Sequence, residues 1–265
     1  MVACGGSKDS DSTGTPGGNT AGGNTAGGAA GGTTTAGWSM SGTVLDFDSG
    51  APAAEGLCID LLDPSPALTG GESELLLSGT VGKGGTFQLD GIVTSSVLGL
   101  LASVKDCGTE NTTVFTSANG VAYADIQLLQ SGDSLDGLVF RSIDLTTLAD
   151  MQSSAEALGY TGTLLTEGFL LGMLQDQNGS PVDGATFSCA ECGPTWYHDD
   201  DATDGRFATG AVPNPSSVAA GQAAAIIAAA PVAQYSTEDG GKHYWAIDLF
   251  GSNPSSALIA PILAD

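Results

Sequence analysis

The sequence predicts a mainly β protein with two small β-sandwich domains, joined by a short helical connector and preceded by a glycine-rich tether. Three observations support this. Only 14% of the 265 residues are charged and 40 are glycine, which suits a loop-rich β protein better than a helical bundle. Short alternating apolar segments are separated by clusters of Gly, Pro, Asp and Ser, as in strands joined by turns. One such unit occurs twice, which indicates two domains.

Residues 1–37 form the predicted tether. The pentapeptide Gly-Gly-Asn-Thr-Ala occurs at 17–21 and again at 22–26. Residues 5–37 contain no apolar side chain large enough to build a core, so we expect this segment to be disordered. A glycine-rich coil of this length spans an r.m.s. distance of about 30 Å.

The first four residues, Met-Val-Ala-Cys, resemble the end of a bacterial lipoprotein signal, in which a small residue precedes the cysteine that receives the lipid. This resemblance implies that Cys4 is the lipidated first residue of the mature protein. The protein would then be extracytoplasmic, anchored by lipid at the outer membrane or the cell surface. The alternative is a cytosolic protein with an ordinary early cysteine.

The first predicted domain spans residues 38–133. Residues 41–46 read as a short alternating strand, and the turn cluster Asp-Ser-Gly-Ala-Pro follows at 48–52. Alternate apolar residues in 57–61 share one face, and 85–89 has the same turn-then-strand character. Both segments are typical of half-buried strands.

The second predicted domain, residues 168–265, repeats this pattern in 169–185. Both copies contain Gly-x-x-x-Asp, then Gly-x-Pro or its equivalent, then a Gly that opens the next strand. The motif resembles the carboxypeptidase regulatory-like module, a small transthyretin-like (prealbumin-like) or immunoglobulin-like β-sandwich. The second copy matches better, although 190–222 is an insertion, and the first copy has Glu-Gly-Leu at 55–57 where Gly-Ala is usual. The resemblance implies a fold and no activity.

Residues 134–167 are the predicted connector, with one helix at 144–159. Asp144 can cap the helix and Gly159 can end it. The apolar residues near one face of this helix are Leu145, Leu148, Met151, Ala155 and Leu158. We expect the helix to pack on a sandwich flank or between the domains.

The charge balance limits the partners. Six basic residues against 30 acidic ones give a net charge of −24, which argues against nucleic acid and against electrostatic adsorption to anionic lipid. No segment has the roughly 18 apolar residues of a membrane-spanning helix. The high charge also discourages self-association, so we expect a monomer.

Five cysteines leave four once Cys4 carries lipid. Outside the cytoplasm the default pairs are Cys58 with Cys107 and Cys189 with Cys192. A redox role for the Cys-x-x-Cys pair is an alternative, although Gly-Pro rather than a helix start follows it. Another alternative is zinc, held by Cys189 and Cys192 with His198 and His243.

Two further clusters in the second domain are candidate binding sites. Four Asp occur within residues 199–204, and Asp199, Asp201 and Asp204 are the expected ligands if the cluster binds calcium. The alternative is a solvated turn. The triplets at 196–198 and 243–245 offer aromatic rings for stacking on sugars, as the resemblance to starch-binding-like sandwiches implies, and core packing is the alternative. The candidate sugar-binding residues are Trp196, Tyr197, Tyr244 and Trp245.

The sequence carries no recognised catalytic motif: neither a Gly-x-Ser-x-Gly elbow, a His-Glu-x-x-His helix nor a Gly-x-x-x-x-Gly-Lys loop is present. We therefore expect a non-catalytic envelope lipoprotein that binds a polysaccharide or another envelope protein, without a cofactor unless it is calcium. The alternatives are a calcium-stabilised adhesion protein and a metal-dependent hydrolase centred on the second domain.

Overall fold

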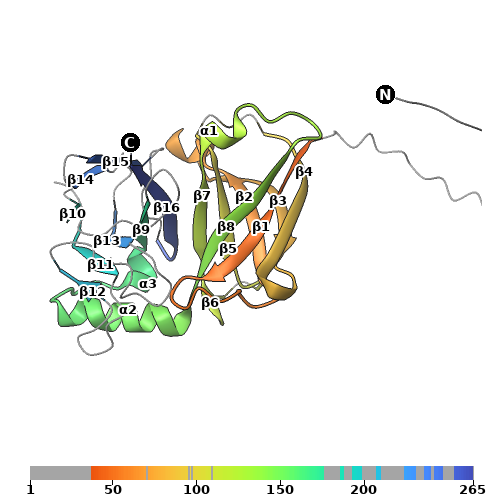
Figure 1. Cartoon of the computed structure of the whole chain (residues 1–265). Helices are drawn as coiled ribbons and strands as arrows, with labels where there is room; N and C mark the ends of the chain where they lie inside the picture. The colour runs from red at the N-terminus through yellow and green to blue at the C-terminus, as the bar shows by residue number, and fades with distance from the viewer. Residues whose placement is uncertain are drawn as a thin grey trace, which may run out of the picture. The chain divides into compact units, whose positions relative to one another are not determined.

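The computed structural model describes residues 37–69, 71–94, 96, 98–108, 110–175, 186–187, 193–198, 207–209, 224–230, 236–239, 242–246 and 254–264. Residues 35–265 form one compact unit by their internal contacts. Strands predominate over short helices in the described residues, so the predicted mainly β fold is confirmed (Figure 1).

A four-stranded sheet has the strand order β4-β1-β8-β6. Its central strand β1 pairs antiparallel with β4 and parallel with β8. In β1 the residues Trp38, Met40 and Val44 are buried, and the residues between them are only partly so, as expected for a strand with one face on a core. The strands of this sheet are β1 (Trp38–Asp46), β4 (Thr86–Ile92), β6 (Val114–Phe115) and β8 (Ser134–Asp144).

A second, larger sheet has the main path β12-β11-β13-β9-β16-β7-β5-β2-β3. Strand β16 pairs in parallel with both β7 and β9. It therefore joins the first half of the chain, which ends with β8 at Asp144, to the second half, which begins with α2 (Leu145–Ala157). The first-half strands are β2 (Cys58–Asp63), β3 (Glu74–Thr80), β5 (Leu100–Lys105) and β7 (Ser117–Val121). The others on the path are β9 (Phe169–Gln175), β11 (Thr195–His198), β12 (Phe207–Ala208), β13 (Ala224–Ala228) and β16 (Ala257–Ala264). Strands β10 (Thr186–Phe187), β14 (Ser236–Asp239) and β15 (Lys242–Ala246) pair off this path.

The helical segments are short, apart from α2 (Leu145–Ala157), which lies within the range 144–159 expected from the sequence. The Asp144 side chain accepts a hydrogen bond from the Thr147 N–H at 2.7 Å and so caps α2. Its buried face includes Leu148, Met151 and Ala155. The other segments are η1 (Ser65–Thr69), η2 (Lys83–Gly85), α1 (Tyr123–Ile126) and α3 (Leu164–Glu167).

Two hydrophobic cores lie within the compact unit. The first contains Trp38, Phe87 and Phe140 and draws on strands of both sheets. The second contains the buried face of α2 together with residues of β9, β11 and β13. The first half also contributes to the second core, through Phe47 and Phe115. The halves are therefore packed into each other as well as joined by β16.

Residues 134–144, expected in the connector, instead form β8, which pairs with β1 along most of its length. The register shifts where Met40 and Gly42 face Leu135 and Leu138. This shift marks a β-bulge at Asp136 and Gly137, and Gly137 has a positive φ of 77°. The bulge breaks the regular alternation of apolar residues, which is why the sequence pattern did not indicate a strand. The division of the chain into domains at 38–133 and 168–265 stays a prediction.

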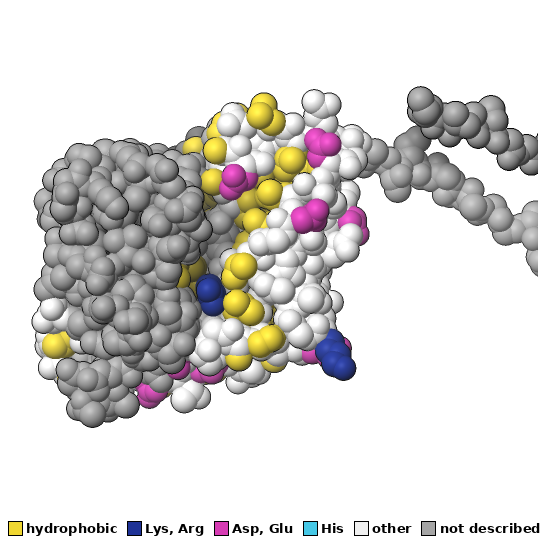
Figure 2. Space-filling view, viewed as in Figure 1, with side chains coloured by type: hydrophobic (Ala, Val, Ile, Leu, Met, Phe, Trp, Pro, Cys, Tyr) yellow, Lys and Arg dark blue, Asp and Glu magenta, His cyan; other side chains and the backbone are white. Residues whose placement is uncertain are grey.

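Acidic side chains are scattered over the described surface seen in Figure 2, and basic ones are few. Among the described residues, no helix combines the length and apolarity needed to cross a membrane.

Candidate functional site

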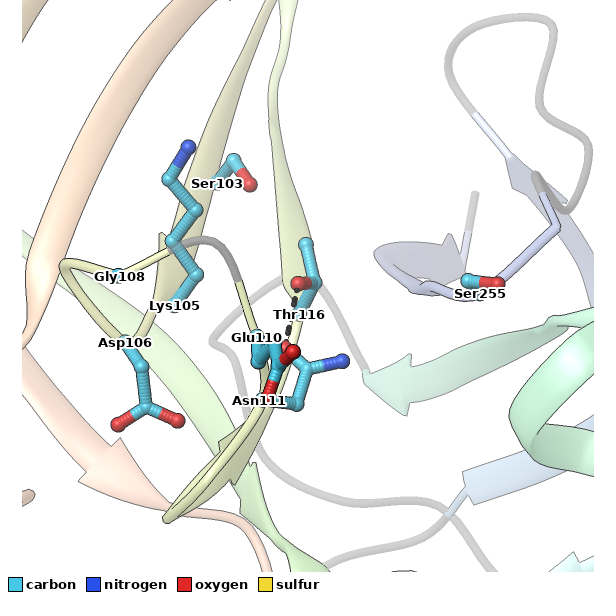
Figure 3. A pocket seen from close by; sticks show the side chains of 8 residues that line it. All are labelled: Ser103, Lys105, Asp106, Gly108, Glu110, Asn111, Thr116 and Ser255. Atoms are coloured by element: carbon cyan, nitrogen blue, oxygen red, sulfur yellow. Dashed lines mark hydrogen bonds between the residues drawn. The ribbon is translucent and has the colours of Figure 1, made fainter.

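A polar cleft of about 510 Å³ lies where the two halves of the chain meet (Figure 3). Its walls come from the end of β5, the loop that joins β5 to β6, the residue before β7, and the turn before β16. The Ala257 N–H donates to the Thr116 carbonyl oxygen at 2.9 Å and holds these last two segments together. The lining residues are Ser103, Lys105, Asp106, Gly108, Glu110, Asn111, Thr116 and Ser255.

The β5–β6 loop is fixed at two points. Cys107 forms a disulfide with Cys58 at the start of β2, with 5.0 Å between the two Cα atoms. Beside it, Asp106 Oδ2 accepts backbone hydrogen bonds from Thr112, Thr113 and Val114 at 2.7, 2.8 and 3.2 Å. Burial alone would raise the pKa of Asp106, but these hydrogen bonds outweigh it and hold the pKa below its ordinary value. The wall of the cleft is thus held in place before any ligand arrives.

The one cation that lines the cleft is already paired. Lys105 Nζ lies 2.5 Å from Asp60 Oδ2, and the Ser78 hydroxyl donates to Asp60 Oδ1 at 2.7 Å. Burial would raise the pKa of Asp60, but the hydrogen bonds from Lys105 and Ser78 and the charge of Lys105 lower it overall. Lys105 therefore adds little net positive charge to the cleft, while Glu110, another lining residue, adds a negative charge.

The remaining lining groups are hydroxyls and an amide. The Thr116 hydroxyl donates to Asn111 Oδ1 at 3.0 Å, so the Asn111 amide is oriented by a neighbour (Figure 3). Ser255 has a positive φ of 59°, an uncommon conformation for a residue other than glycine. No lining residue is His or Cys, so the lining offers no nucleophile paired with an imidazole base. The cleft can hydrogen-bond a polar ligand.

The cysteine predictions are confirmed where they can be compared. Cys58 and Cys107 form the expected disulfide. Cys4, Cys189 and Cys192 lie outside the described residues, so their lipidation and pairing stay predictions. The predicted calcium ligands Asp199, Asp201 and Asp204 also lie outside them.

The aromatic prediction needs correction at two positions. Trp196 and Tyr197 are only 4% and 3% exposed, so neither presents a ring face to a sugar in this structure. Trp196 stacks on Phe207, with 5.2 Å between ring centroids, and meets Tyr160 edge-on at 5.3 Å. The physical reason is that both faces of β11 are covered, since Trp196, Tyr197 and His198 alternate between the two faces and are all buried. Both rings are core residues, which is the alternative that the sequence left open.

For the second triplet only the backbone is described: the residues Tyr244 and Trp245 belong to β15. The structure does not describe the side chains of Tyr244 and Trp245, so sugar binding by these two residues stays a prediction.

His198, which the sequence offered as a zinc ligand, is a buried residue away from the polar cleft's lining. Its side chain is fully buried, and neither ring nitrogen has a hydrogen-bond partner among the described residues. The Phe47 ring meets it edge-on with 4.7 Å between centroids, and Asp48 Oδ1 lies 3.9 Å from Nε2. An unpartnered buried polar group costs about 1–3 kcal/mol of stability, so its presence calls for an explanation.

Sequence reasoning did not predict the cleft. Lys105, Asp106 and Thr116 belong to no recognised motif, and Asn111 belongs only to the formal sequon Asn-Thr-Thr at 111–113. Ser255 is more than a hundred residues further along the chain. The available signal was the polar run that surrounds Cys107, since a disulfide-linked loop rich in Asp, Asn and Thr is often an ordered one.

No protein-family model and no curated protein matches the chain. Among solved structures, the chain is similar to the Bacillus anthracis TIE protein, at 7% identity and a TM-score of 0.27, over 86% of this chain and 34% of that one. It is similar to shaft pilin SpaA from Lactobacillus rhamnosus GG at 9% identity and a TM-score of 0.25, over 86% and 98% of the two chains. A Streptococcal ancillary pilin matches at 11% identity and a TM-score of 0.25, over 87% and 63%. The chain thus spans about a third of the TIE protein chain. All three TM-scores are low, and we base no functional conclusion on them.

Proposed function

We propose that this chain is a non-catalytic surface protein, tethered by a lipid on Cys4, that binds a neutral polysaccharide through the polar cleft. The carboxypeptidase regulatory-like resemblance belongs to the same proposal and supplies the fold, not the ligand. The observation that carries the proposal is the cleft itself, with its wall of hydroxyl and amide groups on a loop fixed by a disulfide.

The lining favours a neutral ligand rich in hydroxyl groups. Ser103 and Ser255 offer hydroxyls that can donate or accept. The Thr116 hydroxyl donates to Asn111 Oδ1 and can still accept, and the Asn111 amide NH₂ can donate. Glu110 and the net charge of −24 repel anionic ligands such as phosphates and uronic acids. A sugar hydroxyl is both donor and acceptor, so it matches such a set of groups without bringing a charge.

The fixed loop supports binding for an entropic reason. A ligand that must first order its site loses affinity, whereas a preorganised wall avoids that cost. The disulfide holds Cys107 in advance, and the three hydrogen bonds to Asp106 hold Thr112, Thr113 and Val114. The disulfide also agrees with an oxidising, extracytoplasmic compartment.

The binding test uses the full-length chain and an array of neutral and acidic polysaccharides. We expect binding to neutral glycans, weakened about tenfold in Thr116→Val, which removes one hydroxyl and keeps the shape of the side chain. Ser153→Ala, which removes an exposed hydroxyl on α2 far along the chain from the cleft residues, is the matched control. Binding that is unchanged in Thr116→Val would place the site elsewhere, and binding only to a protein from the envelope would replace the polysaccharide as ligand.

The tether has its own test. Mass spectrometry of the protein from its native membrane should find acyl groups on Cys4, and Cys4→Ala should release the protein from the membrane fraction. A native product without acyl groups would overturn the lipid tether and leave the cleft proposal standing.

A further inference from the structure

The starting observation is the buried imidazole of His198, the last residue of β11. The side chain has no exposed surface, and neither ring nitrogen is hydrogen-bonded among the described residues. Buried polar atoms in folded proteins nearly always have a partner, whether a protein group, a water or an ion. The described protein groups therefore leave both ring nitrogens of His198 without a hydrogen-bond partner.

A carboxylate of the first half of the chain faces this imidazole. Asp48 lies in the turn after β1, and its Oδ1 is 3.9 Å from His198 Nε2. That separation is too long for a hydrogen bond. Two donors that share one tetrahedral Zn²⁺ at bond lengths of about 2.0–2.2 Å are about 3.4 Å apart. The observed separation is about 0.5 Å longer than this, so binding one ion would bring Asp48 Oδ1 and His198 Nε2 closer by about that amount.

The surroundings suit an ion that enters from one side. The Asp48 side chain is 24% exposed, so the carboxylate connects the buried imidazole with solvent. The neighbouring residue Phe47 is fully buried in the second core and packs against the His198 ring. An ion between Asp48 and His198 would hold the turn after β1 to the end of β11, which lie on the two different halves.

We propose that His198 Nε2 and Asp48 Oδ1 are two ligands of a binding site for a late divalent transition-metal ion, with Zn²⁺ as the type case. An imidazole nitrogen with a carboxylate oxygen suits Zn²⁺, whereas Ca²⁺ and Mg²⁺ prefer oxygen ligands alone. The remaining coordination positions are open to water or to other side chains. This site differs from a Cys₂His₂ zinc site, because it uses Asp48 and needs neither Cys189 nor His243.

The test is a Zn²⁺ titration by calorimetry on the full-length chain in a Cys189→Ser, Cys192→Ser background, which removes competing thiolates. We expect one Zn²⁺ per chain, and a loss of affinity of about tenfold or more in His198→Gln and in Asp48→Asn. His243→Gln is the matched control, because the chain has only two histidines, and it should bind Zn²⁺ as the background does.

A second measurement covers the case in which His198→Gln fails to fold. Proton NMR of the unsubstituted background should show Zn²⁺ shifting the ring signals of one histidine only, assigned to His198 by their persistence in His243→Gln. Asp48→Asn, at a partly exposed turn, then decides the role of the carboxylate. Absence of binding at millimolar Zn²⁺, binding that depends on His243, or full affinity in Asp48→Asn would each overturn the proposal.

Discussion

Asp106 shows how one carboxylate can order a loop. Its Oδ2 takes three backbone N–H groups that would otherwise need water or another acceptor. Because these bonds favour the ionised form, they lower the pKa of Asp106 despite the opposing effect of burial. The folded state therefore prefers the carboxylate, and its contribution to stability is present above the ordinary aspartate pKa of 3.8 and is lost as the pH falls through the lower folded-state pKa.

Asp106→Asn keeps the shape of the side chain and removes the charge. We expect it to lower the free energy of unfolding by about 1 kcal/mol at neutral pH, because charged acceptors make stronger hydrogen bonds than neutral ones. Below pH 3.8 the difference from the unsubstituted protein should shrink. Urea unfolding of both proteins across this range measures it, and comparing the two proteins cancels the other acidic groups. A difference that is constant with pH would contradict the assignment.

Tyr160 and Glu167 form a coupled pair of titratable side chains, in which the tyrosine hydroxyl donates to Glu167 Oε2. Burial, the hydrogen bond and the charge of Glu167 together raise the pKa of Tyr160 to about 12. We expect Glu167→Gln to move this pKa back towards 10.0, since the negative charge is gone. Ultraviolet absorbance of tyrosinate follows the titration, and Tyr160→Phe should remove the late component. If all five tyrosines titrate together while circular dichroism shows an intact fold, the coupling is absent.

At the scale of elements, β8 shows how a side chain can satisfy the backbone hydrogen-bonding groups at the edge of a strand. Strand β6 pairs with only the last two residues of β8. Next to them, Asn119 of β7 accepts from the Arg141 N–H at 2.7 Å and donates to the Arg141 carbonyl at 3.0 Å. The asparagine thus replaces a neighbouring strand at Arg141, and the bulge at Gly137 bends the edge beyond it. Both devices discourage pairing with another chain.

Asn119→Ala should therefore be costly, because it leaves the Arg141 backbone groups without their partner in a buried place. We expect a loss of about 2–3 kcal/mol in the free energy of unfolding, measured by urea denaturation. Gln88→Ala on the exposed side of β4 is the control and should change little. A small effect of Asn119→Ala would mean that water reaches this edge of the sandwich.

At the scale of the whole molecule, the two cores are coupled by strand pairing and by an inserted side chain. Strand β16 is hydrogen-bonded to β7 of the first half and β9 of the second. Phe47 of the first half is fully buried in the second core. Neither core can lose its packing without exposing surface of the other, so the compact unit 35–265 has the contacts of one cooperative body.

Thermal unfolding should accordingly follow one transition, with the same midpoint by tryptophan fluorescence and by far-ultraviolet circular dichroism. Phe47→Ala removes the shared ring and should lower stability by about 3–5 kcal/mol. Two separate transitions in the unsubstituted protein would show that the halves unfold independently, as two unconnected sandwiches would.

The sequence predicted the features that depend on local patterns. Alternation and turn residues indicated the strands around 41–46 and 57–61, and the cap at Asp144 indicated α2. The pairing of Cys58 with Cys107 was predicted from the expected extracytoplasmic location and from the four cysteines that remain after Cys4, and it is confirmed. In contrast, β8 was missed because a bulge interrupts its alternation, and the burial of Trp196 was left undecided because alternation cannot tell whether one or both faces of a strand are covered.

The mainly β class and the Cys58–Cys107 disulfide were thus accessible from residue types and spacing, because turn formation and alternation act over a few neighbouring residues. The cleft, the Asn119 bridge and the contact of Asp48 with His198 required the tertiary structure. Each brings together residues from separate elements, and in the last two cases the elements belong to different sheets. The order of strands in a sheet depends on the packing of the whole chain, and no short stretch of sequence contains it.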